Sequence, residues 1–249
     1  MKIVVKIGSS LILEKNKVNL KPLSKIVKQI AELKKAGHQI MVVSSGAIVL
    51  GRKADSLKKW PENLAGKQAL AALGQPKLMS IYQKFFKKYE LSVAQILLTR
   101  EDIFSKRYLN IKNTLFTLLK KGVIPIINEN DTTATEEIKF GDNDLLSALL
   151  AMKIKADLLI LLSDVDGLYD KSGKVIKKIR KITPEIKKMV FPKREKLTRG
   201  GMGSKIKAAK ICLQAGLPYL VVNGERRNIL LEIMDGEEIG TKFFPKKRD

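Results

Sequence analysis

The chain has 249 residues, of which 45% are hydrophobic and 29% charged, a composition that is ordinary for a folded globular protein and excludes a largely disordered one. Its 48 Lys and Arg residues outnumber 25 Asp and Glu residues, which gives a formal net charge of +23. The single Cys and single His exclude an internal disulfide, a multi-cysteine zinc site and an HExxH metalloenzyme. No apolar run approaches the roughly 20 residues of a membrane span, and the strand-like start at Met1 leaves no room for a signal peptide. We therefore expect a cytoplasmic protein without a membrane partner.

In the first half of the chain, short β-branched runs alternate with amphipathic helical segments. Strands are predicted at Lys2–Ile7, Gln39–Val43, Val93–Leu98 and Val123–Ile127. Helices are predicted from Pro22 to Gly37 and at Leu64–Leu73, Lys77–Tyr89 and Tyr108–Lys121. Gly74-Gln75-Pro76 is expected to separate the second and third of these helices. The polar segment Thr132–Phe140 predicts a hairpin, and residues 132–141 are a candidate seam between two halves.

The second half continues the alternation. Its predicted elements are a helix at Asn143–Met152, a strand at Leu158–Leu162, a turn at Tyr169–Gly173, a helix start at Thr183–Glu185, a glycine-rich basic loop at Lys193–Gly203, a helix at Ser204–Ala215 and a strand at Tyr219–Val222. Strands separated by helices favour a mainly parallel sheet covered on both faces. We therefore predict the α/β class, a three-layer α-β-α sandwich, as a single domain over residues 1–249.

The positive charge has two interpretations. It favours anionic partners, and a nucleic-acid-binding protein would bind through several phosphate contacts. However, the lysines are spread over predicted helix faces, as in Lys21, Lys25 and Lys28, and are not interleaved with aromatic residues. We favour a solvated lysine-rich surface with no nucleic-acid partner, whose field attracts small anions such as nucleotides and carboxylates.

Polar or glycine-rich residues follow four of the predicted strands. They are Gly8-Ser9-Ser10, Ser44–Ala47, Asn128–Asp131 and Ser163–Gly167. Ligands of open α/β sheets bind at the carboxyl ends of strands, where backbone N–H groups of tight turns can hold phosphates. Each segment alone could simply end a strand, but four in one chain indicate a binding cleft. The chain has no GxxxxGK[ST] motif and no GxGxxG after the first strand, which excludes a P-loop kinase and disfavours a dinucleotide-binding fold.

Three charged segments are candidates for binding phosphate. Lys6 lies in a predicted buried strand, where an ammonium group requires an anion or carboxylate nearby, unless the strand is an edge strand with Lys6 in water. The segment Lys193–Lys205 (KREKLTRGGMGSK) places glycines and a lysine at a helix start, an anion-binding arrangement, and the alternative is a solvated basic loop. Gly141–Asp144 places two carboxylates and an amide at another helix start, which is more than N-capping requires.

The strings VVKIGSS, VSSGAI, INENDT, GDNDLLSA, LLSDVDGLY and GGMGSK, in this order, resemble the amino acid kinase family from Lys2 to about Pro245. INEND, GDND and SSGAI are most similar to the members that phosphorylate L-glutamate. The resemblance implies the amino acid kinase fold and transfer of the ATP γ-phosphoryl group to the side-chain carboxylate of L-glutamate, giving L-glutamyl 5-phosphate, the first step of proline biosynthesis. Many such members carry a C-terminal PUA domain of RNA-binding type, and none is expected here.

The resemblance also implies roles for individual residues. Lys6 and Lys205 would contact the phosphates, Asp144 would hold the two lysines, and Mg²⁺ would bridge phosphate oxygens. Ser45, Asp131 and Asn143 would hold L-glutamate. The N-terminal part of the domain would form mainly the glutamate site and the C-terminal part mainly the ATP site. The residues implied for the nucleotide are Lys6, Ser163, Asp164, Arg199, Gly200, Gly201, Met202, Gly203, Ser204 and Lys205.

The family resemblance further implies proline as a feedback inhibitor, a homodimer or homotetramer, and a glutamyl-phosphate reductase as recipient of the product. Three alternatives stay open besides the nucleic-acid-binding protein mentioned above. A sister kinase could act on acetylglutamate, carbamate, aspartate or a nucleoside monophosphate, although Asp131 disfavours acetylglutamate, whose blocked amine has no positive charge. A regulatory relative could bind an amino acid without catalysis, although the set of Lys6, Asp144 and Lys205 disfavours it.

Overall fold

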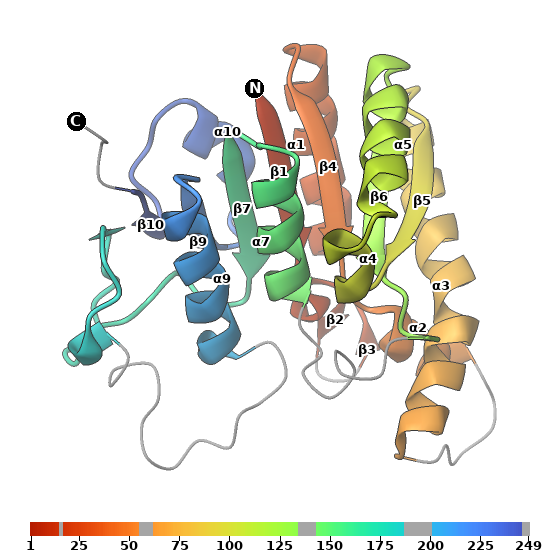
Figure 1. The fold of residues 1–249 in the computed structure, drawn as a ribbon, viewed down its shortest axis with the longest axis horizontal. Coiled ribbons are helices and arrows are strands. Elements are labelled where there is room, and N and C mark those ends of the chain that lie inside the picture. Colours follow the sequence, from red (N-terminus) through yellow and green to blue (C-terminus); the bar gives the residue numbers. More distant parts are fainter. Residues whose placement is uncertain (15–16, 55–61, 134–142, 187–200, 246–249) are drawn as a thin grey trace.

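The computed structural model describes residues 1–14, 17–54, 62–133, 143–186 and 201–245. An eight-stranded sheet with the order β5-β6-β4-β1-β7-β9-β10-β8 forms its centre (Figure 1). The strands of this sheet are β1 (Lys2–Ile7), β4 (Gln39–Ser44), β5 (Val93–Leu98), β6 (Ile124–Glu129), β7 (Leu158–Ser163), β8 (Lys178–Ile179), β9 (Tyr219–Asn223) and β10 (Thr241–Phe243). All neighbouring strands are parallel except β9 and β10. A separate antiparallel pair joins β2 (Leu13–Glu14) to β3 (Lys17–Val18).

Helices cover both faces of the sheet, which confirms the predicted three-layer α-β-α sandwich (Figure 1). One layer contains α1 (Lys21–Lys35), α3 (Leu64–Lys87) and α10 (Ile229–Met234). The other layer contains α4 (Arg100–Phe104), α5 (Tyr108–Lys120), α7 (Asn143–Lys153) and α9 (Met202–Gln214). The 3-10 turn η1 (Ser9–Leu11) and α2 (Ala47–Ala54) follow β1 and β4.

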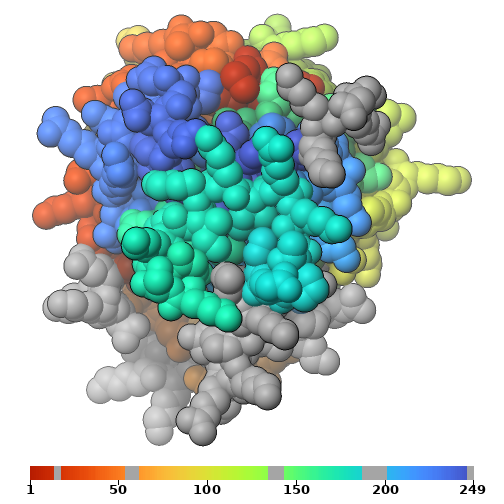
Figure 2. Space-filling view, turned by 90° about the vertical axis from the view of Figure 1, so that its left-hand side faces the viewer, coloured from red at the N-terminus to blue at the C-terminus, as the bar shows by residue number. Residues whose placement is uncertain are grey.

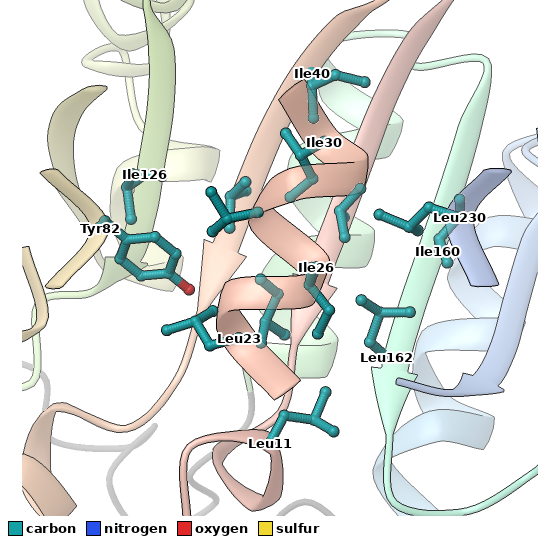
Figure 3. Close-up of a cluster of buried hydrophobic side chains, with 14 of the residues drawn as sticks. Leu11, Leu23, Ile26, Ile30, Ile40, Tyr82, Ile126, Ile160, Leu162 and Leu230 are labelled. Atoms are coloured by element: carbon teal, nitrogen blue, oxygen red, sulfur yellow. The ribbon is translucent and has the colours of Figure 1, made fainter. Parts of the chain in front are cut away.

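The sheet has a hydrophobic cluster on each face because side chains alternate along every strand. In β1, Ile3, Val5 and Ile7 face the α1 layer and Val4 faces the α7 layer. Figure 3 shows α1 of the first cluster packed over the sheet, with Leu23, Ile26 and Ile30 facing strand residues such as Ile160. Two covered faces explain why the central strands are continuous apolar runs. The same alternation places Lys6 on the side of Val4, toward α7 and α9.

The strands predicted in the first half are confirmed to within two residues, but the predicted break at Gly74-Gln75-Pro76 is wrong. α3 runs without interruption through Pro76. Pro76 cannot donate to the carbonyl of Ala72 one turn earlier. Both residues are exposed, so water can reach that carbonyl and the helix tolerates the proline. Gly74 and Gln75, between them in the chain, are buried.

Other elements differ in smaller ways. The predicted helix at 204–215 begins two residues earlier, at Met202. The turn at 169–173 is confirmed, with Gly173 at φ 81° and the Asp170 amide donating to the Lys174 carbonyl at 2.8 Å. The helices α2, α4 and α10 and the strand β10 were not predicted. Most of the predicted 132–140 hairpin and of its seam lies outside the described residues, as do residues 193–200 of the basic loop.

Figure 2 looks onto the end of the sheet that carries β10 and β8, where the teal residues that follow β7 cover the centre of the surface. These residues connect β7 to the short strand β8 and lie next to C-terminal residues drawn in blue. Within the part of the chain that the structure describes, no helix is long and apolar enough to cross a membrane.

Candidate active site

The carboxyl ends of β1, β4, β6 and β7 meet at one edge of the sheet and line a cleft of about 510 Å³. Parallel strands bring these ends together although the ends of β1 and β7, Ile7 and Ser163, are 156 residues apart in the chain, as open α/β sheets do at their ligand sites. The residues that line the cleft are Lys6, Gly8, Ser9, Ser10, Ser45, Gly46, Ala47, Ile48, Val49, Asn128, Glu129, Asp131, Asn143, Ser163, Asp164, Val165, Gly201, Met202 and Lys205. All four polar strand ends that the sequence singled out therefore contribute to one site.

Three helices begin at the cleft. The first residue of α2 (Ala47), of α7 (Asn143) and of α9 (Met202) each line it. Helix N-termini present free backbone N–H groups and the positive end of the helix dipole. Together with the two lysines of the cleft, they make it a site for ligands with several negative charges. The turn into α2 requires Gly46, whose φ of 109° is unfavourable for other residues.

Asp144 lies behind two cleft lysines and joins them. It is fully buried, and its side chain does not line the cleft. Lys6 pairs with its Oδ1 atom, and the Lys205 Nζ atom lies 3.3 Å from Oδ2. The Ser204 hydroxyl donates to Oδ2 at 2.8 Å. Lys6 and Lys205 are 5% and 4% exposed, so two ammonium groups from opposite ends of the chain are held side by side by one carboxylate.

The charge balance of this group sets its protonation. Burial works to raise the pKa of Asp144, but the charges of Lys6 and Lys205 and the hydrogen bonds from Lys6 and Ser204 outweigh it and hold the pKa below the ordinary value of 3.8. Asp144 is therefore ionised near neutral pH. Lys6 and Lys205 both line the cleft, so a phosphate bound there can pair with their ammonium groups.

Asn143 connects the ends of two strands, β4 and β6, on the other side of the cleft. Its Nδ2 atom lies 3.0 Å from Ser45 Oγ, 3.0 Å from Asn128 Oδ1 and 3.2 Å from the Ser44 carbonyl. Asn128 Oδ1 also accepts from the Glu129 amide at 2.8 Å. The amide oxygen of Asn143 and the amide nitrogen of Asn128 are buried without a hydrogen-bond partner in the described structure. An acceptor and a donor thus remain available for a polar ligand.

The other predicted residues fall into three groups. Asp131 lines the cleft beyond the end of β6, and Ser163 and Asp164 line it at the end of β7, where the Ser163 hydroxyl donates to Asp164 Oδ1 at 3.0 Å. Gly201 and Met202 also line it, whereas Gly203 and Ser204 do not. Arg199 and Gly200 lie outside the described residues.

Sequence reasoning placed no role on Asn128, Ser9 or Ser10, although it singled out the strand ends that contain them. The signal for Asn128 was its position in the INEND string directly after a strand. Ser204 also differs from expectation. It was implied for the nucleotide, but its hydroxyl donates to Asp144 and its side chain does not line the cleft. That contact joins positions 60 residues apart, so the local pattern contains no sign of it.

The carboxylates of the cleft fit a particular kind of metal binding. Among the described residues, no three His, Cys, Asp or Glu side chains gather into a metal-binding group. Glu129 and Asp131 instead line the cleft at the end of β6, and Asp164 lines it at the end of β7. Mg²⁺ is commonly held by one or two carboxylates, several waters and substrate phosphates. The donor set therefore fits a magnesium ion that binds together with a nucleotide.

Comparison with known proteins gives three findings. The model of the amino acid kinase family matches residues 1–223. A glutamate 5-kinase of Caldanaerobacter subterraneus is 49% identical over 99% of this chain and 68% of its own length. A glutamate 5-kinase of Clostridium acetobutylicum is 45% identical over 99% of this chain and 96% of its own length.

A solved structure agrees at the level of the fold. The N-acetylglutamate synthase of Neisseria gonorrhoeae, in a complex with coenzyme A and L-arginine, superposes with a TM-score of 0.65 at 14% sequence identity. The match covers 98% of this chain and 61% of that one. At this identity the likeness concerns the arrangement of helices and strands alone.

Proposed function

The chain belongs to the amino acid kinase family, and from this premise we infer that it transfers the γ-phosphoryl group of ATP to the side-chain carboxylate of L-glutamate. The product is L-glutamyl 5-phosphate, the first intermediate of proline biosynthesis. The observation that carries this function is the pair of buried lysines joined by Asp144 at the edge of a cleft. The identity of 44–49% to glutamate 5-kinases selects glutamate among the acceptors of the family.

The reaction needs alignment and charge neutralisation more than proton transfer. A carboxylate with an ordinary pKa of about 4.3 is already ionised at neutral pH, so no general base is required. An oxygen of the glutamate side chain attacks the γ-phosphorus atom, and the bond to the leaving oxygen of ADP breaks. Two anions must approach each other for this step, and positive groups are required to offset their repulsion.

We assign this neutralisation to Lys6 and Lys205. Each presents a compact charge on the cleft, and Asp144 fixes the position of both. Asp144 does not touch the substrates in this assignment and is a positioning residue. Ser163, Asp164, Gly201 and Met202 hold the nucleotide in the same proposal. A magnesium ion bound with ATP would be held by phosphate oxygens and Asp164, and would supply further positive charge to the phosphates.

We assign the glutamate backbone groups to the other side of the cleft. Asp131 provides the negative charge that an α-ammonium requires, and the unpartnered Asn143 Oδ1 atom accepts from the same ammonium. The Ser45 hydroxyl, whose oxygen accepts from Asn143 Nδ2, donates to the α-carboxylate. The unpartnered Asn143 Oδ1 and Asn128 Nδ2 atoms support a polar ligand at this place. In this proposal the N-terminal part of the single domain binds mainly glutamate and the C-terminal part mainly ATP.

Further properties belong to the same proposal. Proline would inhibit by competing at or beside the glutamate site. The chain would act in the cytoplasm as a homodimer or homotetramer and deliver its product to a glutamyl-phosphate reductase. An acyl phosphate is open to attack by water and by its own amine, which favours rapid consumption by such a partner.

The test is release of ADP from Mg-ATP by the purified chain, with L-glutamate, N-acetylglutamate, aspartate or UMP offered separately. Hydroxylamine is included because it converts an acyl phosphate into a measurable hydroxamate. We expect ADP and hydroxamate in equal amounts with L-glutamate alone. Turnover with another acceptor would overturn the glutamate assignment but leave the phosphate site in place.

A further inference from the structure

We propose that Tyr82 is a positioning residue for the acceptor substrate, acting through Ser44 on the turn that carries Ser45. This inference rests on the proposed function, because it concerns the glutamate side of the cleft. Tyr82 lies on α3, 38 residues from Ser44, and neither side chain lines the cleft. Its hydroxyl group nevertheless reaches the last residue of β4, from which the chain turns into the site.

The hydroxyl is the one polar atom that this side chain brings into the first hydrophobic cluster. Tyr82 and Ser44 are both fully buried, and their oxygen atoms lie 2.7 Å apart. Figure 3 shows the Tyr82 ring beside Ile126, with its oxygen turned toward the end of β4. Burial raises the pKa of Tyr82 far above its ordinary value of 10.0, so the hydroxyl remains protonated and able to donate.

The protons of this group can be placed. The Ser44 hydroxyl donates to the Ser45 carbonyl at 3.1 Å. A serine hydroxyl has a single proton, so once that proton is used, Ser44 can only accept from Tyr82. The resulting chain of donors runs from the Tyr82 hydroxyl through Ser44 Oγ to the Ser45 carbonyl oxygen, and fixes the peptide group of Ser45.

The end of β4 and the turn that follows it belong to the acceptor side of the cleft. Asn143 Nδ2 contacts both the Ser44 carbonyl at 3.2 Å and Ser45 Oγ at 3.0 Å. Tyr82 and Asn143 therefore hold the end of β4 from the two faces of the sheet, one through Ser44 Oγ and the other through Ser44 O. Removing the Tyr82 hydroxyl would release one of these two constraints without replacing any residue that lines the cleft.

Packing alone does not require a tyrosine here. Phe86, one turn further along α3, is stacked against the Tyr82 ring at 6.3 Å between centroids and is equally buried. A phenylalanine at position 82 would fill the same space and avoid burying a polar atom. The hydroxyl is therefore retained at a cost that its hydrogen bond to Ser44 offsets.

The test is steady-state kinetics of Tyr82→Phe. Glutamate is varied at saturating Mg-ATP, and in a second series Mg-ATP is varied at saturating glutamate. We expect the KM for glutamate to rise about three- to tenfold, the range expected for one hydrogen bond, with the KM for ATP unchanged. Tyr108→Phe is the matched control, because its buried hydroxyl has no partner in the described structure and lies outside the cleft. It should leave both KM values unchanged.

The double variant Tyr82→Phe/Ser44→Ala tests whether the two hydroxyl groups act through one hydrogen bond, and melting temperatures test for a purely structural role. Tyr82→Phe and Ser44→Ala break the same hydrogen bond, so the double variant should raise the KM for glutamate little more than the larger single effect. Multiplied effects would overturn the proposal. So would a lower melting temperature of Tyr82→Phe with an unchanged KM for glutamate, which would indicate a structural role only. A wild-type chain without glutamate turnover would overturn the proposed function itself.

Discussion

At the residue scale, Asp144 allows two lysines to be buried next to each other at the carboxyl end of the sheet. Asp144→Asn keeps the shape of the side chain and removes its charge. We expect kcat to fall by roughly 100-fold or more, the effect of losing one preorganised electrostatic contact, because Lys6 and Lys205 would repel each other. Turnover assays beside circular dichroism check this, and near-wild-type turnover would contradict the assigned role.

The same carboxylate predicts a pH dependence of stability. The folded-state pKa of Asp144 lies below its ordinary value of 3.8, so its ion pairs stabilise the fold above that value and the contribution disappears as the pH falls through the folded-state pKa. Removing one member of a buried ion pair lowers the free energy of unfolding by about 3–5 kcal/mol. Urea unfolding at pH 7 should therefore show a large deficit for Asp144→Asn, and the deficit should narrow toward pH 3. A pH-independent deficit would contradict this reasoning.

A third prediction at this scale concerns Asp131 on the acceptor side. Asp131→Asn retains size and hydrogen bonding but removes the charge that we pair with the glutamate ammonium. We expect the KM for glutamate to rise at least about tenfold, since charged hydrogen bonds contribute about 1.5–3 kcal/mol, and the KM for ATP to stay within about twofold of wild type. Asp235→Asn, an exposed change at the end of α10, is the matched control. An effect on ATP alone would show that Asp131 belongs to the nucleotide side.

Single residues differ in how much of their role the sequence could predict. Lys6 was predictable because a lysine inside an apolar strand requires a partner, and it was expected to meet Asp144. The contacts of Tyr82 with Ser44 and of Ser204 with Asp144 were not, because a tyrosine at helical spacing and a serine after glycines have ordinary local explanations. Such pairs become visible only when the sheet brings distant segments together.

At the element scale, the close crossing of α2 and α3 predicts that adding one methyl group at Gly74 lowers the stability of the fold. A Cβ atom at Gly74 would lie 1.7 Å from the Ala47 carbonyl oxygen, so the two helices would have to move apart. Alanine is better than glycine in a helix by about 1 kcal/mol, but overpacking typically costs 1–3 kcal/mol and here involves backbone atoms. We expect Gly74→Ala to lower the melting temperature by several degrees, at about 2–4 °C per kcal/mol.

The displacement should also reach the cleft, because Ala47, Ile48 and Val49 of α2 line it. We expect a higher KM for glutamate in Gly74→Ala, measured with the melting curves. Ser80→Ala, at an exposed position of the same helix, is the control and should change neither quantity. A melting temperature above that of wild type would show that helix propensity outweighs the crossing.

Elements were predictable where they are long and regular. The six-residue strands β1 and β5 were placed with their observed bounds because they combine β-branched residues with clear stops. The split of α3 was wrong because a proline is a strong local signal, whereas the exposure of Pro76 and Ala72 depends on tertiary packing. The strand β10 has three residues and forms by antiparallel pairing with β9, which no local periodicity reveals.

At the scale of the whole molecule, one edge of the sheet concentrates what the sequence distributes over the chain. The strand order places β1 between β4 and β7, so that Lys6 lies between the predicted glutamate side and the predicted nucleotide side. The class of fold and the position of the cleft followed from the alternation of elements and the polar strand ends. The residues of the 134–142 and 187–200 segments lie outside the described structure, and their predicted roles remain predictions.

The net charge gives the last prediction. With 48 cations and 25 acidic residues, at least 23 cations have no acidic side chain of their own to pair with. Mutual repulsion of unpaired charges destabilises a compact state, and salt screens it, with a Debye length of about 10 Å at 0.1 M. We therefore expect the melting temperature to rise by several degrees between 0.02 and 0.3 M NaCl, at about 2–4 °C for each kcal/mol of repulsion removed.

A matched variant shows whether surface repulsion is the cause. Lys77 and Lys112 are exposed on α3 and α5, and replacing both by Glu lowers the formal charge by four, from +23 to +19. The salt dependence of its melting temperature should be weaker than that of the wild type. An uncharged osmolyte at equal osmolality should raise the melting temperatures of the wild type and of the variant by equal amounts. If the wild type and the variant respond to salt alike, the effect arises from chloride bound beside Lys6 and Lys205 rather than from the surface. Measuring the salt dependence of the melting temperature of Lys6→Met distinguishes surface repulsion from chloride binding, because only a chloride bound at the site loses its partner in that variant.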